Sequence, residues 1–219
     1  MLAYATSTVS ERKRKYVEKY GPITRLLHFT HLISFIILAI TGLALAYKWT
    51  GLGEFLFGSM KNVKTIHEIC GWILLITGTP LFLKLLPESL FRPYDFKWLA
   101  KLGGYLDPSH RTVAPAGKIN AGQKIFFWFS FFSLIIMGIT GLAVMYDMVS
   151  KELRATLLLI HFVVGVLWIA FVIIHFYLAT FANPGTIWAM ITGKVSEDYI
   201  KFHNPEWYKE LREKGIIKG

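Results

Sequence analysis

Five of the seven histidines lie within or at the edges of long apolar segments; they are His28, His31, His67, His161 and His175. Histidine is costly to place in hydrocarbon unless something satisfies its ring nitrogens. The stretch HFVVGVLWIAFVIIH, residues 161–175, carries two of them around thirteen residues that are all apolar or glycine. A neutral imidazole can bind haem iron through its lone pair, which removes the cost of burying the ring.

Four apolar runs must position these side chains, and they cover approximately residues 26–47, 66–86, 124–146 and 156–181. Each reaches about 20 residues, enough for a helix to cross a hydrocarbon core of ~30 Å. The first run follows a basic segment and has no small-residue cleavage site after it, so we interpret it as a retained span. We predict an all-α integral membrane protein, a single domain over residues 1–219 built as a four-transmembrane-helix bundle.

The net charge of +10 is distributed in a way that predicts the orientation of this bundle. Of the 24 Lys and Arg residues, six lie in 1–25, seven in 84–124 and six in 194–218, whereas three lie in 48–64 and two in 151–154. Cytoplasmic segments carry such an excess of positive charge. We therefore expect both termini, the loop 87–123 and the tail 183–219 in the cytoplasm of a bacterial cell. The basicity reflects topology and contact with membrane lipid, and nucleic acid is not expected as a partner.

Helix geometry and topology together assign a depth to each membrane histidine. At about 100° per residue, fourteen residues fall about 40° short of four turns, so His161 and His175 share a face and lie about 21 Å apart along the axis. The alternating direction of the spans puts His67 and His161 near the outer side. It puts His175 and either His28 or His31 near the inner side. Two histidines facing each other at each of two depths is an arrangement that binds two haems.

The choice between His28 and His31 stays open on spacing alone, because residues three apart share a helix face. Arg25 lies one turn before His28. Its long side chain can extend to the interface and meet a haem propionate there. This favours His28.

Glycines accompany the histidines. Gly71 and Gly165 each follow a histidine by four residues, where they would let a porphyrin plane approach the backbone. The segments AITGLALAY (39–47) and GITGLAVMY (138–146) also resemble each other, and both belong to spans that run outward. The ordinary interpretation is close helix packing through small residues. The alternative is that small residues leave room for a flat cofactor.

Other chemistries fit the sequence less well. A proton relay or a carboxylate–histidine metal site needs acidic groups, but within the spans only Glu68 is acidic, and it lies near an end. Cys70 is the single cysteine, so the chain by itself holds no iron–sulfur cluster, thiolate zinc site or internal disulfide. One membrane histidine would more often be an interhelical hydrogen-bonding residue than a ligand. Four that pair by depth favour haem.

The sequence resembles the gamma subunit of respiratory formate dehydrogenases, the membrane cytochrome b of that complex. The similarity lies in RLLH (25–28) followed by ITG (40–42), in the two histidines fourteen residues apart, in KINAGQK (118–124), and in the tail segment MITGKVSEDYIKFHNPEWYKE (190–210). It covers nearly the whole chain. The resemblance implies two haem b groups, an inner one ligated by His28 and His175 and an outer one ligated by His67 and His161.

The same resemblance implies a quinone site beside the inner haem, formed by Asn120, Gly122 and Gln123. Amide groups are suitable donors to quinone carbonyl oxygens, although helix capping is their ordinary role. The chain departs from the family in the tail, which tends to carry paired histidines where His203 is followed by Asn204. We expect His203 and His110 to be solvated residues of the tail and loop, and their roles, like that of His31, are not assigned.

These features predict an electron-transfer subunit that is not itself the formate-oxidising enzyme. Electrons would come from an iron–sulfur subunit, which accompanies a molybdenum or tungsten catalytic subunit, and would reduce menaquinone or ubiquinone. The complex could form a higher oligomer. One alternative is the cytochrome b of a nickel–iron hydrogenase or a thiosulfate-type reductase. A different class is a haem-free membrane anchor or transporter.

Overall fold

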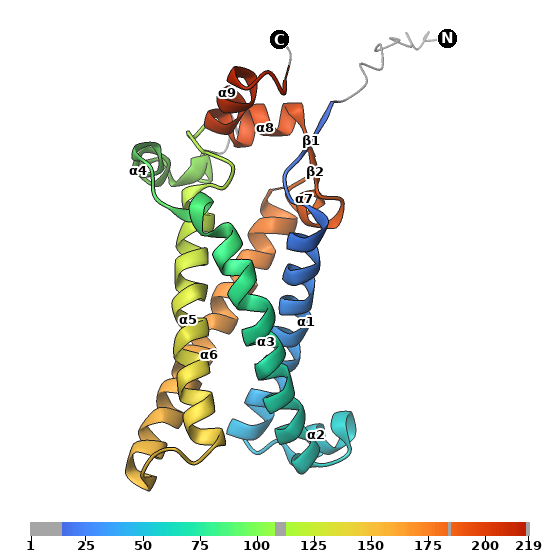
Figure 1. Ribbon diagram of the computed structural model, residues 1–219, viewed down its shortest axis with the longest axis vertical. Coiled ribbons are helices and arrows are strands. Elements are labelled where there is room, and N and C mark those ends of the chain that lie inside the picture. The colour runs from blue at the N-terminus through green and yellow to red at the C-terminus, as the bar shows by residue number, and fades with distance from the viewer. Residues whose placement is uncertain (1–14, 108–112, 184, 218–219) are drawn as a thin grey trace, which may run out of the picture.

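The computed structural model describes residues 15–107, 113–183 and 185–217. Four long helices form the body of the molecule: α1 (Pro22–Ala46), α3 (Met60–Ser89), α5 (Ala121–Met145) and α6 (Lys151–Tyr177). A π-helical turn, η2 (Leu178–Ala182), continues α6. All four are long and apolar enough to cross a membrane, and Figure 1 shows them running along the long axis of the molecule.

The outer faces of these helices are apolar. Ile36, Ile76, Ile139 and Ile173, one from each long helix, expose between 48% and 67% of their surface. So continuous an apolar surface is unfavourable in water, and monomeric soluble proteins rarely have one. Contact with lipid tails carries no such free-energy cost. The four predicted spans coincide with the four long helices.

The helices extend beyond the apolar runs at their N-terminal ends. α3 begins after Ser59, whose hydroxyl accepts a hydrogen bond from Asn62 N at 3.1 Å. α6 begins after Ser150, which accepts from Leu153 N at 3.3 Å. Such caps satisfy the free N–H groups of the first turn and let the helix continue into the polar boundary. Hydropathy alone reports only the apolar part of each segment, so the helices begin a few residues before the predicted spans.

The short elements gather at the two ends of the bundle. α2 (Thr50–Phe57) and the α5–α6 turn lie at one end, and α4 (Pro93–Ala100), η1 (Leu102–Gly104), α7 (Trp188–Ile191), α8 (Glu197–His203) and α9 (Pro205–Glu213) lie at the other (Figure 1). β1 (Tyr16–Glu18) and α9, the first and last described elements, are at the same end. The four crossings thus leave both described ends of the chain on one side.

A small sheet adds strand structure to the predicted all-α fold. β1 pairs antiparallel with β2 (Lys194–Ser196), with Val17 opposite Val195. Gly193 precedes β2 with a φ of +82°, and a Cβ there would lie 2.5 Å from the carbonyl oxygen of Tyr20. Only glycine fits so close an approach of two backbones. The sheet therefore ties the start of α1 to the tail, a long-range pairing that helical periodicity does not reveal.

The core of the bundle is aromatic and lies at mid-height. Its buried residues are Phe35, Leu74, Phe82, Phe127, Leu134 and Trp168. The indole N–H of Trp168, a side chain only 2% exposed, donates to Ser130 Oγ at 3.1 Å. Trp168 lies midway along the chain between His161 and His175, so this packed layer separates the two histidine levels.

Candidate functional site

His67 of α3 and His161 of α6 face each other across the bundle. Their ring centroids are 6.3 Å apart and the ring planes make an angle of 62°. Two imidazole nitrogens at about 2 Å from one metal ion, on opposite sides of it, leave their ring centroids roughly 6 Å apart. His67 and His161 are therefore close enough that they would hold one metal-containing group between them.

Each of these rings is held by a threonine. Thr41 Oγ1 of α1 lies 2.9 Å from Nδ1 of His67, and Thr140 Oγ1 of α5 lies 2.8 Å from Nδ1 of His161. The contacts use Nδ1 in both cases and leave Nε2 for another partner. These threonines belong to the two ITG segments that resemble each other, and spacing along the sequence does not single them out.

The glycines of the same segments make room for the imidazoles. A Cβ on Gly42 would lie 3.2 Å from His67 Cε1, and a Cβ on Gly141 would lie 3.3 Å from His161 Cε1. By contrast, a Cβ on Gly71 would meet nothing within 4 Å. Thus Gly42 and Gly141 admit the histidine side chains themselves, while Gly71 borders open space.

That space is a cavity of about 680 Å³ lined by both histidines, Gly71 and Gly165. Its volume is within the range of small-molecule and cofactor sites. The walls are almost entirely apolar, and Lys64 and Arg154 are cationic side chains in its lining. Arg154 is positioned by its bonds to Val144 O, at 3.0 Å, and to Asp147. Sequence reasoning missed these two cations.

The second histidine level is organised differently. Within the described part of the chain, the ring of His175 stacks on Phe126, with centroids 4.2 Å apart, and the ring of His28 contacts Phe29. The two histidines make no ring contact with each other there. Nδ1 of His28 is buried without a hydrogen-bond partner. Among the described residues, the rings of His28 and His175 thus make no contact of the kind that joins His67 and His161.

His28 and His31, which share a face in the sequence, have different surroundings. The ring of His31 lies against Phe82 and Trp168, at centroid distances of 5.9 and 6.2 Å. A Cβ on Gly78 would lie 2.9 Å from His31 Cε1, so α3 approaches this ring closely. His31 thus belongs to the aromatic layer between the two levels.

Arg25 is connected to the tail. Its Nη1 donates to Ile191 O at 2.7 Å, and its Nε is buried without a partner. The guanidinium therefore joins α1 to α7 and still has donor capacity for an anionic group.

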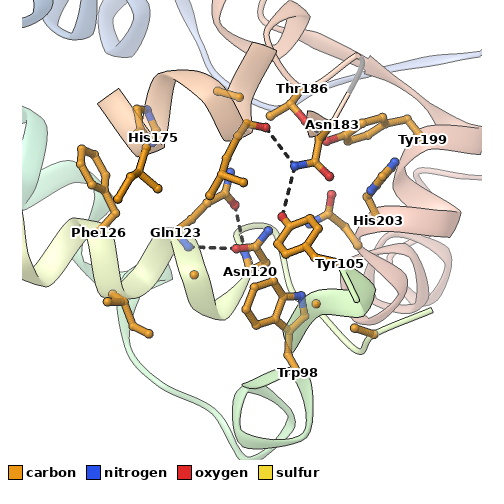
Figure 2. Close-up of a pocket in the computed structure, with 18 of the residues that line it drawn as sticks. Trp98, Tyr105, Asn120, Gln123, Phe126, His175, Asn183, Thr186, Tyr199 and His203 are labelled. Atoms are coloured by element: carbon orange, nitrogen blue, oxygen red, sulfur yellow. Dashed lines mark hydrogen bonds between the residues drawn. The ribbon is translucent and has the colours of Figure 1, made fainter. Parts of the chain in front are cut away.

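Asn120, Gly122, Gln123 and His175 line one pocket of about 250 Å³ at the end of the bundle that carries the tail (Figure 2). Asn120 and Gln123 also form a capping box: Asn120 Oδ1 accepts from Gln123 N at 2.9 Å, and Gln123 Oε1 accepts from Asn120 N at 3.0 Å. These bonds engage only the oxygen of each amide. The two NH₂ groups remain as donors, so the capping role and a ligand-binding role are compatible.

The tail and the loop complete this pocket. Asn183 donates to Tyr105 Oη at 3.1 Å, and the Thr186 and Tyr199 hydroxyls are hydrogen-bonded at 2.6 Å. His203 stacks on Tyr199 with ring centroids 4.4 Å apart (Figure 2). His203 is only partly exposed to solvent, because α8 folds back over the pocket. His110 lies outside the described residues. The only sequence signal for this role is the tail segment that carries the family resemblance.

Lys19 also lines this pocket. Burial and the neighbouring Lys118 lower the pKa of Lys19 to about 8. Burial, with a contribution from Lys19, also lowers the pKa of His203. Two titratable groups thus lie at this end of the bundle in environments that disfavour their charged forms.

A buried ion pair attaches α4, which forms one wall of the pocket, to α5. Lys124 Nζ of α5 donates to Asp95 Oδ2 of α4 at 2.6 Å and to Leu90 O at 3.0 Å. Asp95 Oδ2 also accepts from Arg92 N at 2.6 Å, which caps α4. Trp98 of α4 lines the pocket, so the ion pair positions this wall against α5.

Comparison with known proteins identifies the family. Residues 19–193 match the family model of prokaryotic cytochrome b561. The chain belongs to this family. A cytochrome b binds haem b, and the four apolar helices make this one a multi-pass membrane protein.

The relatives have related names. This cytochrome b is 28% identical over 203 residues to the cytochrome b556 subunit of the nitrate-inducible formate dehydrogenase of Escherichia coli K12, covering 91% of this chain and 93% of that one. It is 23% identical over 205 residues to a second formate dehydrogenase cytochrome b556 subunit of that strain, covering 92% and 96%. A Haemophilus influenzae formate dehydrogenase cytochrome b556 subunit is 26% identical over 191 residues, covering 85% and 79%. The resemblance found in the sequence is confirmed.

The residues present fit haem b at the outer level. The cytochrome offers two facing imidazoles, an apolar cavity of cofactor size and cations for anionic substituents. At the level of His28 and His175, Nε of Arg25 is a buried donor without a hydrogen-bond partner, and a propionate would satisfy it. The level of His67 and His161 is therefore chemically suited to haem b.

Proposed function

We propose that this cytochrome b is the membrane subunit of a formate dehydrogenase complex and passes electrons from an iron–sulfur subunit to a quinone. The names of its relatives support this assignment over a hydrogenase or thiosulfate-reductase subunit. The observation that carries the proposal is the separation of His67 and His161, 6.3 Å between ring centroids across an apolar cavity. A haem-free anchor or transporter would have no use for that pair.

His67 and His161 would hold an outer haem, and His28 and His175 an inner one, with Arg25 near a propionate. Haem b supplies a one-electron couple at each level when bound. The residues between the levels, including Trp168, exclude water and hold the two sites at a constant separation. The excess of Lys and Arg at the tail end supports a cytoplasmic inner level and an outer level that faces the donor.

The pocket beside His175 would bind the quinone, either menaquinone or ubiquinone. The NH₂ groups of Asn120 and Gln123 would donate to a quinone carbonyl, and Gly122 would leave space for the ring. Quinone reduction takes up two electrons and two protons. Oxidation of formate to carbon dioxide releases two electrons and one proton. With oxidation outside and proton uptake from the cytoplasm, the cycle separates charge across the membrane.

The test uses the purified complex with its partner subunits. Formate should produce b-type bands in a reduced-minus-oxidised spectrum, and a quinone analogue should reoxidise them. His161→Ala and His175→Ala should each remove one haem, whereas His203→Ala should retain both. Absence of b-type bands, or reduction by hydrogen but not by formate, would reject the assignment. Retention of both haems in either membrane variant would reject the pairing.

A further inference from the structure

Two threonine–histidine pairs repeat on the two helix hairpins of this protein. Thr41 of α1 contacts His67 of α3, and Thr140 of α5 contacts His161 of α6, through the same atoms and at nearly the same distance. Both threonines are buried. In each pair the next residue is a glycine against the same imidazole. The two halves of the bundle thus present their histidines to the cavity in matching ways.

Proton accounting determines the direction of these hydrogen bonds. A threonine hydroxyl has one proton to donate. Thr41 donates it to Ile37 O at 2.7 Å, and Thr140 donates it to Ile136 O at 2.7 Å. The hydroxyl oxygens can then only accept from the histidines. In this arrangement each ring carries its proton on Nδ1, which leaves the lone pair on Nε2, the nitrogen that a metal needs.

We propose that Thr41 and Thr140 are positioning residues that select the tautomer and ring plane of His67 and His161 and lower the reduction potential of the haem between them. This inference rests on the outer haem of the proposed function. An Nδ1–H that donates a hydrogen bond makes the opposite nitrogen more basic. A more basic ligand stabilises the oxidised iron more than the reduced iron, so the potential falls.

The ordinary role of a membrane threonine is different. Thr77 and Thr79 of α3 donate to the carbonyl four residues earlier, at 2.7 and 2.8 Å, and neither is hydrogen-bonded to a histidine of the described residues. That bond satisfies the hydroxyl and does nothing further. Thr41 and Thr140 make the same bond and add the imidazole. Thr77 is therefore the matched control, a partly buried threonine on the helix that carries His67.

The experiment is a redox titration of the purified complex, followed by its haem absorption bands and by the low-spin ferric EPR signal. The variants are Thr41→Val and Thr140→Val, which keep the shape and remove the hydroxyl, with Thr41→Ser, Thr140→Ser and Thr77→Val. Each valine variant should raise the ratio of reduced to oxidised outer haem about tenfold at a given potential, which is about 59 mV for one electron. The EPR signal should change with the ring plane.

The controls separate this role from a structural one. The serine variants should restore the potential, Thr77→Val should leave it unchanged, and the inner haem should not respond in any variant. The inference is also supported if a valine variant loses the outer haem alone and the serine variant at the same position retains it. An outer haem with unchanged potential and EPR signal in both valine variants overturns it. A complex that lacks an outer haem before substitution contradicts the proposed function instead.

Discussion

The imidazoles of His67 and His161 lie 6.3 Å apart, centroid to centroid, although they belong to different hairpins and are far apart in the chain. Each is held by a threonine of the neighbouring helix and packed against a glycine. The relationship is therefore built by all four long helices. No such ring contact joins His28 and His175 among the described residues.

Gly71→Leu tests whether the outer cavity is cofactor space. A Cβ at Gly71 meets nothing within 4 Å, so the larger side chain would fill empty space without disturbing the helices. If haem occupies the cavity, the variant should fold and keep the inner haem but lose the outer one. Absorption spectra and haem content of the purified protein measure this. Gly51→Leu, in a helix where a Cβ also meets nothing, should keep both haems.

Asn120→Asp separates helix capping from ligand binding. Aspartate caps a helix as well as asparagine does, so the bond from Gln123 N is kept while the NH₂ donor is lost. We expect reduction of the haems by formate to be unchanged and their reoxidation by a quinone to slow about fivefold, since one hydrogen bond is worth ~1 kcal/mol. Stopped-flow absorption measures both steps. A normal rate of reoxidation would place the quinone elsewhere.

Lys124→Met should destabilise the tail end of the bundle by about 3–5 kcal/mol, because it leaves the buried carboxylate of Asp95 without its cation. The double variant Lys124→Met, Asp95→Asn should recover much of this loss. Thermal unfolding in detergent gives the comparison. Lys209→Met, which breaks an exposed pair with Glu206, serves as the control and should cost less than ~1 kcal/mol. Equal effects of the two single variants would contradict the buried pair.

Lys19→Met should stabilise the protein near neutral pH and lose this advantage in alkali. The pKa of Lys19 is lowered to about 8 from 10.5, chiefly by burial, so below pH 8 the full cost of burying its charge is present. That cost is at most ~3 kcal/mol. Between these pKa values the unfolded chain keeps a proton that the folded one has lost, and the stability of the unsubstituted protein rises with pH.

Unfolding curves at several pH values measure this effect. The exposed Lys15, substituted in the same way, should show no such trend. The burial of the Lys19 charge would be contradicted if the free energies of unfolding of Lys19→Met and of the unsubstituted protein differed by the same amount from neutral to alkaline pH.

The sequence by itself determined that the chain has four segments long and apolar enough to span a membrane, which are helices in the structure, and it predicts a depth for each histidine. Span length follows from the thickness of hydrocarbon, and the common face of His161 and His175 follows from the regular turn of a helix. These are one-dimensional properties, readable from composition and spacing. The existence of two levels of histidines therefore needed no tertiary information.

Only the tertiary structure decided how the side chains meet. Helix rotation and crossing depend on many packed side chains at once, and these place Thr41 and Thr140 on the two outer imidazoles and turn His31 into the aromatic layer. The return of α8 over the bundle brings His203 into the pocket beside His175. The spacing of residues along a chain predicts their depth and the helix face that they share. A hydrogen bond between two helices also depends on how each helix is rotated about its axis relative to the other. Only side-chain packing sets that rotation.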